Sequence, residues 1–390
     1  MDQVALTPPA AALTSRASWL TPVSLLLVNR LGVWLIAFLG LALLSGPPKM
    51  AGNAIPGNLF LDGWTRWDAQ WYAHIARDGH TNSSLDASSQ TDTGHFPLYP
   101  WTVRAVAWLT HDVYVAGILV SNISFVLAGL LLFRLIEAKF GTALARRTII
   151  LWSVWPFSYT FSAMYTESLF MLCVAAAFTA GESRRWWLAS TFAALAGFTR
   201  LVGSVTGVAI AAMYLRAGNE REKWIDKNAL WLPLGFAGVI GFAGLLWAWF
   251  GDPLLFIKVH AAAGWGDFNS FDELKRVFRL WVNTHFGQIA SGNVPLVHTL
   301  HILSMALAAV LCIIGLWRLP IAWSVWLILT VAISYYRWGC FGRHFSTCWP
   351  AFVVAAMLLK SKPAYDTAIY LCVILLAVLT IMFTQGYWVA

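Results

Sequence analysis

Apolar runs of about 20 residues recur along the chain, and short polar segments separate them. A helix needs about 20 mostly apolar residues to cross the hydrocarbon core of a bilayer, so each run predicts a membrane-spanning helix. The candidate spans are 21–45, 113–134, 148–163, 165–181, 187–199, 201–216, 229–250, 296–317, 321–336, 345–359 and 365–384. Two of them, 187–199 and 201–216, are short enough to form a re-entrant pair.

A longer polar stretch, 46–112, follows the first span. Within it the apolar residues Trp67, Trp71 and Ile75 recur at the spacing of one helix face, and charged residues lie between them. This alternation predicts an amphipathic helix at a membrane surface. A second helix of the same kind is predicted over 99–109.

These elements predict an all-α polytopic membrane protein with about 11 transmembrane helices. We expect one membrane-embedded domain over 1–390, with long loops at 46–112 and 251–295. The composition agrees with this class, because 59% of the residues are apolar and only 11% are charged. A net charge of +8 raises nucleic acid as a partner, but the basic residues form no continuous stripe, so we expect membrane lipids and no nucleic acid.

The basic residues cluster in alternate connections between the spans. They are Arg134, Lys139, Arg146, Arg147, Arg184, Arg185, Arg216, Arg221, Lys223, Lys227, Arg318, Lys360 and Lys362. Connections rich in lysine and arginine face the cytoplasm. The loops 46–112 and 251–295 are therefore predicted on the opposite side, where long loops usually carry function.

Two acids in the first loop are candidates for chemistry. Asp68 stands at the start of the first amphipathic helix, where a carboxylate can be a simple helix-start acid favoured by the helix dipole. It can also be a general base that accepts a proton from an attacking hydroxyl. Asp62, six residues earlier, is the second candidate for this role, with a solvated loop acid as the alternative.

Two further candidates lie at predicted turns. His95 opens the phrase His95-Phe96-Pro97-Leu98-Tyr99-Pro100, which is a rigid turn. Its imidazole can contact a phosphate or sugar, or simply be solvated. Glu167 lies just inside apolar sequence, where a carboxylate is costly, so it either pairs with Arg200 or Arg104 or belongs to a functional site.

Cationic side chains gather at two breaks between spans. Arg200 lies between two short apolar pieces, where a guanidinium can pair with an acid or grip a phosphate with parallel hydrogen bonds. Arg337, Arg343 and His344 lie on the side predicted to face away from the cytoplasm. Because they oppose the topological charge rule, we interpret them as an anion-binding group.

Several well-known catalytic motifs are absent from the sequence. It contains no nucleotide-binding G-x-x-x-x-G-K-[ST], no G-x-S-x-G, no H-E-x-x-H, and no D-x-D or E-x-D on the outer face. A nucleotide-powered reaction or a dedicated metal site is therefore not supported. We expect no cofactor and no metal requirement.

Several separate phrases together resemble one family, the PIG-V mannosyltransferases. They are, in chain order, Arg66-Trp67-Asp68-Ala69-Gln70-Trp71-Tyr72, the turn from His95 to Pro100, Tyr165-Thr166-Glu167-Ser168-Leu169-Phe170, Thr199-Arg200-Leu201-Val202-Gly203, Gly251-Asp252-Pro253, and Arg343 with Pro350. Each phrase taken alone is weak evidence for the family. Their shared order and spacing over about 62–352 carry the resemblance.

The resemblance implies a GT-C type glycosyltransferase that takes mannose or a related hexose from a polyprenyl-phosphate carrier and transfers it with inversion. The acceptor would be a glycolipid or glycan on the non-cytoplasmic face. Asp68 would be the base, and Arg200 and Arg343 with His344 would hold the carrier phosphate. Arg66, Trp67, His95, Tyr99, Glu167 and Asp62 would bind substrate or support the site. The residues Leu201-Val202 depart from eukaryotic members, so a glycosylphosphatidylinositol precursor is not assumed as acceptor.

Two other functions stay open at this point. A lipid or sugar-lipid transporter could use intramembrane charges such as Glu167, Arg200 and Arg30 along a substrate pathway. A non-catalytic subunit of a glycosylation complex is the third possibility. We expect the bacterial cytoplasmic membrane as the location, or the endoplasmic reticulum membrane in a eukaryote.

Overall fold

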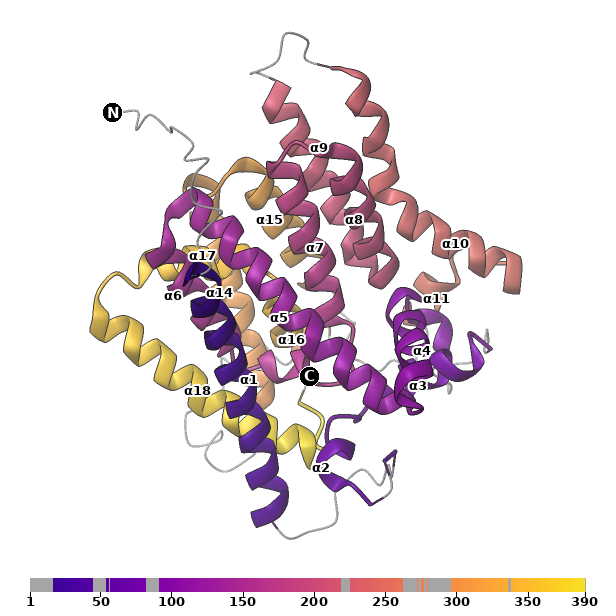
Figure 1. Cartoon of the computed structure of the whole chain (residues 1–390), viewed down its shortest axis with the longest axis vertical. Helices are drawn as coiled ribbons and strands as arrows, with labels where there is room; N and C mark the ends of the chain where they lie inside the picture. Colours follow the sequence, from indigo (N-terminus) through magenta and orange to yellow (C-terminus); the bar gives the residue numbers. More distant parts are fainter. Residues whose placement is uncertain are drawn as a thin grey trace.

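The computed structural model describes residues 17–44, 54–55, 57–81, 91–218, 225–261, 272, 275–276, 279, 296–335 and 338–389. Helices dominate this part of the chain, and the regular elements described in it are α-helices and 3-10 turns. Figure 1 shows them packed as one body, with the C-terminus near its middle.

The long helices carry most of the apolar sequence. They are α1 (Ala17–Leu43), α5 (Val113–Phe140), α7 (Glu167–Glu182), α8 (Trp186–Thr199), α9 (Ser204–Gly218), α10 (Ala237–Phe250), α14 (Leu296–Arg318), α15 (Ile321–Tyr335) and α18 (Lys362–Thr384). The shorter helices are α2 (Leu59–Asp62), α3 (Ala69–Asp78), α4 (Leu98–Thr110), α6 (Thr142–Ser153), α11 (Leu255–Ala261), α16 (Phe341–Ser346) and α17 (Trp349–Leu358). Both amphipathic helices predicted in the first loop are confirmed, as α3 and α4.

Six helical segments of the described chain are long and apolar enough to cross a membrane. They are Pro22–Leu43, Val113–Phe140, Leu201–Gly218, Lys227–Phe250, Val297–Arg318 and Lys362–Thr384. Ile321–Tyr335 and Trp349–Leu358 are shorter apolar helices. The predicted all-helical polytopic class is confirmed, although several predicted crossings are made of short helices.

The segment predicted as a single span over 148–163 is broken. Helix α6 ends at Ser153, and a 3-10 turn follows over Ser158–Phe161. Pro156 lies between them and cannot continue a helix, because its ring removes a backbone donor. The break frees backbone carbonyls inside the protein, and these need partners.

Arg30 of α1 supplies those partners. Its guanidinium donates to the carbonyl of Ser153 at 3.0 Å, to the carbonyl of Ser158 at 2.9 Å and to the hydroxyl of Ser162 at 3.2 Å. The guanidinium carbon of Arg30 also lies 4.2 Å from the centre of the Phe125 ring. A buried arginine inside a predicted span is thus explained by the helix break beside it.

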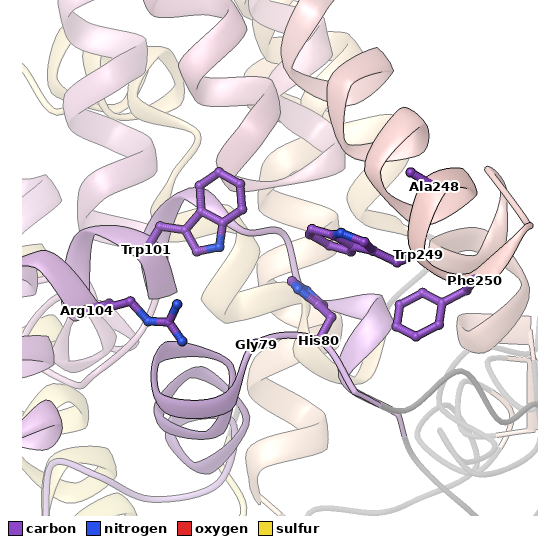
Figure 2. Close-up of a pocket in the computed structure, with 7 residues that line it drawn as sticks. All are labelled: Gly79, His80, Trp101, Arg104, Ala248, Trp249 and Phe250. Atoms are coloured by element: carbon purple, nitrogen blue, oxygen red, sulfur yellow. The ribbon is translucent and has the colours of Figure 1, made fainter.

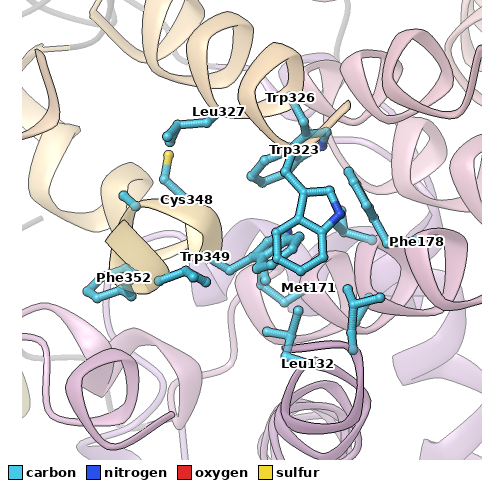
Figure 3. Packing of buried hydrophobic residues seen from close by; sticks show 14 of the residues in the cluster. Leu132, Met171, Phe178, Trp323, Trp326, Leu327, Cys348, Trp349 and Phe352 are labelled. Carbon is cyan, nitrogen blue, oxygen red and sulfur yellow. The ribbon is translucent and has the colours of Figure 1, made fainter. Parts of the chain in front are cut away.

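The largest apolar core joins α15 and α17 to α5 and α7. Trp323 and Trp326 of α15 and Trp349 of α17 are all buried, and the rings of Trp323 and Trp349 lie 4.5 Å apart, edge to face. Phe178 of α7 packs edge-on against Trp349 at 5.4 Å. Figure 3 shows these rings beside Met171 and Leu132, so α5, α7, α15 and α17 meet here.

The segment that leads into α3 is fastened to the end of the chain. The Arg66 guanidinium pairs with Asp62 at 2.8 Å and also donates to the carbonyl of Thr384 at 3.3 Å, at the end of α18. The indole of Trp67 donates to the carbonyl of Tyr387 at 3.2 Å. These contacts fix the chain just before α3, where Asp68 lies.

Candidate active site

Four charged side chains from distant parts of the sequence form one continuous chain of ion pairs. Asp68 Oδ2 accepts a hydrogen bond from Arg343 Nη1 at 2.6 Å. Arg343 Nε in turn donates to Glu167 Oε1 at 2.6 Å. The same oxygen of Glu167 pairs with Arg200 Nη1. We call this the Asp68–Arg200 ion chain, made of Asp68, Arg343, Glu167 and Arg200.

Burial differs along the ion chain. The Glu167 side chain is 0% exposed and that of Arg343 is 5% exposed, whereas Asp68 and Arg200 at the two ends are 20% and 17% exposed. The formal charges of the two acids and the two arginines cancel. The middle pair, Glu167 and Arg343, can therefore be buried only while every partner is present. Asp68 and Arg200 are therefore the more exposed members of the ion chain.

The backbone before Asp68 is in an unusual conformation. Trp67 has φ of 56°, the left-handed region that residues other than glycine rarely adopt. Its side chain is held by the hydrogen bond to Tyr387 and by the Trp388 ring, whose centre lies 5.0 Å away edge-on. The C-terminal tail thus holds the turn that presents Asp68 as the first residue before α3.

Arg343 belongs to the six-residue helix α16, which is fixed by its neighbour Gly342. The Gly342 N–H donates to Nδ1 of His301 at 3.0 Å, and its carbonyl accepts from the Trp155 indole at 3.1 Å. A Cβ atom at Gly342 would clash with the Phe157 ring. Only glycine fits this position, and its three neighbours set where Arg343 points.

Glu167 and Arg200 each stand at a helix end. Glu167 is the first residue of α7, and Arg200 is the extended residue between α8 and a short 3-10 turn, with φ of −156°. Arg200 Nη1 also donates to the hydroxyl of Thr166 at 3.1 Å. The predicted pairing of Glu167 with Arg200 is confirmed, while Arg104 bonds elsewhere, to carbonyls at the end of α3.

Two tyrosines complete the surroundings of Arg343, and sequence reasoning missed both. The Arg343 guanidinium carbon lies 4.1 Å from the centre of the Tyr165 ring, within cation–π range. Tyr72 is buried one helical turn after Asp68; burial first, and then the Asp68 carboxylate, raise its pKa to about 12. The i, i+4 spacing from Asp68 was the signal for Tyr72, and the position two residues before Glu167 was the signal for Tyr165.

The charge of Arg343 is secured by its partners. Burial alone lowers the pKa of an arginine, but the carboxylates of Glu167 and Asp68 outweigh it and raise the pKa of Arg343 well above its usual range. The guanidinium is therefore always protonated. It can orient Asp68 and stabilise negative charge nearby.

The other predicted residues lie outside the ion chain. Asp62 pairs with Arg66 and accepts the N–H groups of Ala54 and Ile55 at 2.7 and 3.2 Å, so the solvated-acid alternative is wrong. Tyr99 is buried and donates to the carbonyl of Gly117 on α5 at 3.0 Å. Both positions support the fold around the site.

The predicted histidines and one arginine have different outcomes. His95 is buried, with its ring stacked 5.7 Å from Trp71 and edge-on to Tyr72 at 5.3 Å, so the solvated alternative is wrong for it too. His344 follows Arg343 on α16 and is half-buried. Arg337 lies outside the described residues. Among the residues that the structure describes, no three His, Cys, Asp or Glu side chains converge as a metal site.

One family model matches part of the chain. Residues 94–247 match the family described as dolichyl-phosphate-mannose-protein mannosyltransferase. No curated protein matches the chain. The matched residues include Glu167 and Arg200 but end before Arg343, and they make up less than half of the sequence.

The fold is shared with an archaeal enzyme. The crystal structure of the Archaeoglobus fulgidus oligosaccharyltransferase in the apo form is similar, with a TM-score of 0.52 at 12% identity, over 97% of this chain and 57% of that chain. The complex of the same enzyme with Zn and sulfate has a TM-score of 0.49 at 13% identity, over 93% of this chain and 53% of that chain. The form tethered to an acceptor peptide containing the NVT sequon gives 0.49 at 12% identity, over 95% and 56%.

This chain spans only a little over half the length of that oligosaccharyltransferase. At such low identity, the likeness to the apo form shows the fold and nothing about the reaction. The predicted fold class is thereby confirmed. The narrower resemblance to the PIG-V family stays a prediction.

Proposed function

We propose that the protein is an inverting glycosyltransferase that moves a mannosyl or related hexosyl residue from a polyprenyl-phosphate donor to a glycolipid or glycan acceptor. The Asp68–Arg200 ion chain carries this proposal, because it offers a base and a cation at the two accessible ends of one buried network. The description of the matching family, which names a dolichyl-phosphate-mannose donor, supports the choice of sugar and carrier.

The ion chain assigns different roles to its members. Asp68 accepts the proton of the acceptor hydroxyl as that oxygen attacks the anomeric carbon. The bond between this carbon and the phosphate oxygen breaks on the opposite face, through an oxocarbenium-like state, and the polyprenyl phosphate leaves with the bonding electrons. The reaction thus forms one glycosidic bond, breaks one sugar–phosphate bond and moves one proton to Asp68.

Arg200 is the better of the two arginines for the leaving phosphate. It has a single carboxylate partner and is partly exposed, whereas Arg343 already serves both Asp68 and Glu167. A guanidinium in a site of low dielectric stabilises the charge that develops on a phosphate oxygen. Arg343 then acts as a positioning residue for Asp68, and Glu167 does the same for Arg200.

Sidedness and location are part of the proposal. The positive-inside pattern supports an active site on the non-cytoplasmic face, reached by a donor that is itself a membrane lipid. A bacterial cytoplasmic membrane fits this arrangement, and an endoplasmic reticulum membrane would fit a eukaryotic host. The donor, the acceptor and the surrounding lipids are the expected partners.

The test uses the full chain in detergent with polyprenyl-phosphate-mannose as donor. We expect release of polyprenyl phosphate that increases with a suitable glycan acceptor and disappears in Asp68→Asn. Asp78→Asn is the matched control, because Asp78 is the last residue of α3, at the end away from Asp68, and is exposed. Full turnover in Asp68→Asn would remove this residue from the role of base.

A transporter would give a different result in the same system. Movement of the labelled carrier across liposomes, without release of polyprenyl phosphate under any acceptor condition, would overturn the transferase proposal. A non-catalytic subunit would show neither activity. The three functions are therefore separated by two measurements on one preparation.

A further inference from the structure

A cavity of about 590 Å³ lies at the far end of α3 from Asp68. It is lined by Gly79 and His80 after α3, Trp101 and Arg104 of α4, and Ala248, Trp249 and Phe250 at the end of α10. Figure 2 shows the two indoles and the imidazole around a common space, with the Arg104 guanidinium at its edge. None of these residues belongs to the ion chain.

His80 lines this cavity and holds beside it a hydrogen-bond acceptor that is unpartnered among the described residues. Its Nε2 lies 2.8 Å from the carbonyl oxygen of His95, and because a carbonyl only accepts, Nε2 carries the proton and donates. Burial lowers the pKa of His80, so the ring is neutral and Nδ1 keeps its lone pair. In the part of the chain that the structure describes, this buried Nδ1 has no hydrogen-bond partner.

Arg104 offers fixed donors at the same cavity. Its Nε donates to the carbonyl of Ala76 at 2.5 Å, and its Nη2 donates to the carbonyl of Arg77 at 2.7 Å. Both carbonyls belong to the last turn of α3, where a helix leaves them without partners of its own. The guanidinium is thus held in place, and among the described residues its Nη1 group has no acceptor.

Two tryptophans expose their rings beside these polar groups. Trp101 is 39% exposed and Trp249 is 44% exposed. Trp101 packs edge-on against Phe198 at 5.4 Å. Trp249 stacks on His80 at 5.6 Å and meets Phe250 edge-on at 6.4 Å. The open surfaces of such rings suit the apolar C–H face of a sugar.

We propose that this cavity is a carbohydrate subsite for a distal part of the acceptor glycan, an inference that rests on the proposed transferase function. A sugar hydroxyl both donates and accepts, which matches the His80 acceptor and the Arg104 donors. A lipid tail would leave both polar groups unsatisfied. A phosphate would face the lone pair of His80 Nδ1.

Helix α3 sets the length that an acceptor must have. Its ten residues rise about 1.5 Å each, which separates Asp68 from the cavity by about 15 Å. Several linked sugars span such a distance, whereas a single sugar does not. The acceptor class is therefore an oligosaccharide, free or attached to a carrier.

Binding to the full chain in detergent tests this assignment, with mannose, mannobiose, mannotriose and mannotetraose and the matching glucose oligomers as probes. We expect affinity to rise with length for one series. Trp101→Ala and Trp249→Ala should each weaken binding of the longest probe about tenfold. Trp108→Ala and Trp247→Ala are matched controls, since both lie exposed on the same two helices and line no part of this cavity.

The outcomes separate this subsite from the transferase proposal. Asp68→Asn should still bind the longest probe, with an affinity that depends on Trp101 and Trp249, although it transfers no sugar. Binding that responds to Trp101 and Trp249 in a protein without turnover would overturn the transferase and retain the subsite. Three results would overturn the subsite. The first is turnover and oligosaccharide binding that are unchanged in Trp101→Ala and Trp249→Ala, and the second is no binding of either oligosaccharide series. The third is that these two variants change only the binding of the protein to phosphatidylglycerol nanodiscs.

Discussion

Arg343 and Glu167 meet through a single oxygen, because Arg343 Nε donates to Glu167 Oε1 at 2.6 Å and Arg200 pairs with the same atom. The second oxygen, Oε2, has no hydrogen-bond partner within the described residues. Two guanidinium groups therefore depend on one buried carboxylate oxygen. Loss of this acid changes both ends of the ion chain at once.

Glu167→Gln should damage stability and activity together. The amide keeps the shape of the side chain but leaves two arginines facing only one carboxylate, and breaking a buried ion pair costs about 3 kcal/mol or more. We expect a lower thermal unfolding temperature in detergent and at least a tenfold loss of transfer, measured as polyprenyl phosphate release. Glu182→Gln is the control at the other end of α7, where a partly exposed pair with Lys139 contributes less than about 1 kcal/mol. Equal behaviour of the two variants would contradict the role of Glu167.

Gly342→Ala should displace Arg343 without touching any charge. The added methyl group would clash with the Phe157 ring, and overpacking of this kind costs about 1–3 kcal/mol. We expect reduced transfer and a lower unfolding temperature, with partial recovery of transfer, but not of the unfolding temperature, in the double variant Gly342→Ala, Phe157→Ala, because truncation of the buried Phe157 leaves a cavity. Gly244→Ala is the control, because no heavy atom outside the adjoining backbone of its own helix lies within 4 Å of the added Cβ. Failure of the second substitution to restore any activity would show that the clash is not the cause.

A chelator should leave the reaction intact. Asp68 and Glu167, the acids of the site, are both paired with arginines, whose charge opposes a divalent cation at the same oxygens. We therefore expect unchanged transfer in EDTA, measured as release of polyprenyl phosphate before and after dialysis. Activity that disappears in EDTA and returns with a divalent cation would contradict this expectation.

The sequence was sufficient for the class of fold and for the identity of the four ion-chain residues. Apolar length predicted the helices, and the cost of charge inside apolar sequence marked Glu167 and Arg200 as partners. The resemblance to the PIG-V family, and not this cost, assigned Asp68 and Arg343 to one site. Whether these groups carry out catalysis stays a prediction.

Other features depend on contacts that no local pattern contains. The order of pairing, with Arg343 between two acids, is set by α16, and α16 is set by the contacts of Gly342 with His301 and Trp155. Nothing near Gly342 in the sequence indicates those distant partners. Pro156 was a signal for the break after Ser153 that the prediction of one span over 148–163 overlooked, and the buried partner of the break, Arg30, lies more than a hundred residues earlier in the chain.

Acid should weaken the fold around the proposed sugar subsite through His80. Burial lowers the pKa of His80 in the folded protein below its ordinary value of 6.5, whereas the unfolded chain keeps that value. The unfolded state therefore binds a proton first as the pH falls, so the stability that His80 contributes is complete above about pH 6.5 and is lost between that pH and its lower folded pKa. We expect the unfolding temperature to fall over this window, and His80→Gln to reduce the fall. His111→Asn is the control, because His111 is an exposed helix-end residue with φ of 57°, a conformation that asparagine tolerates. An identical pH dependence in the unchanged protein and in His80→Gln would exclude His80 as the group responsible.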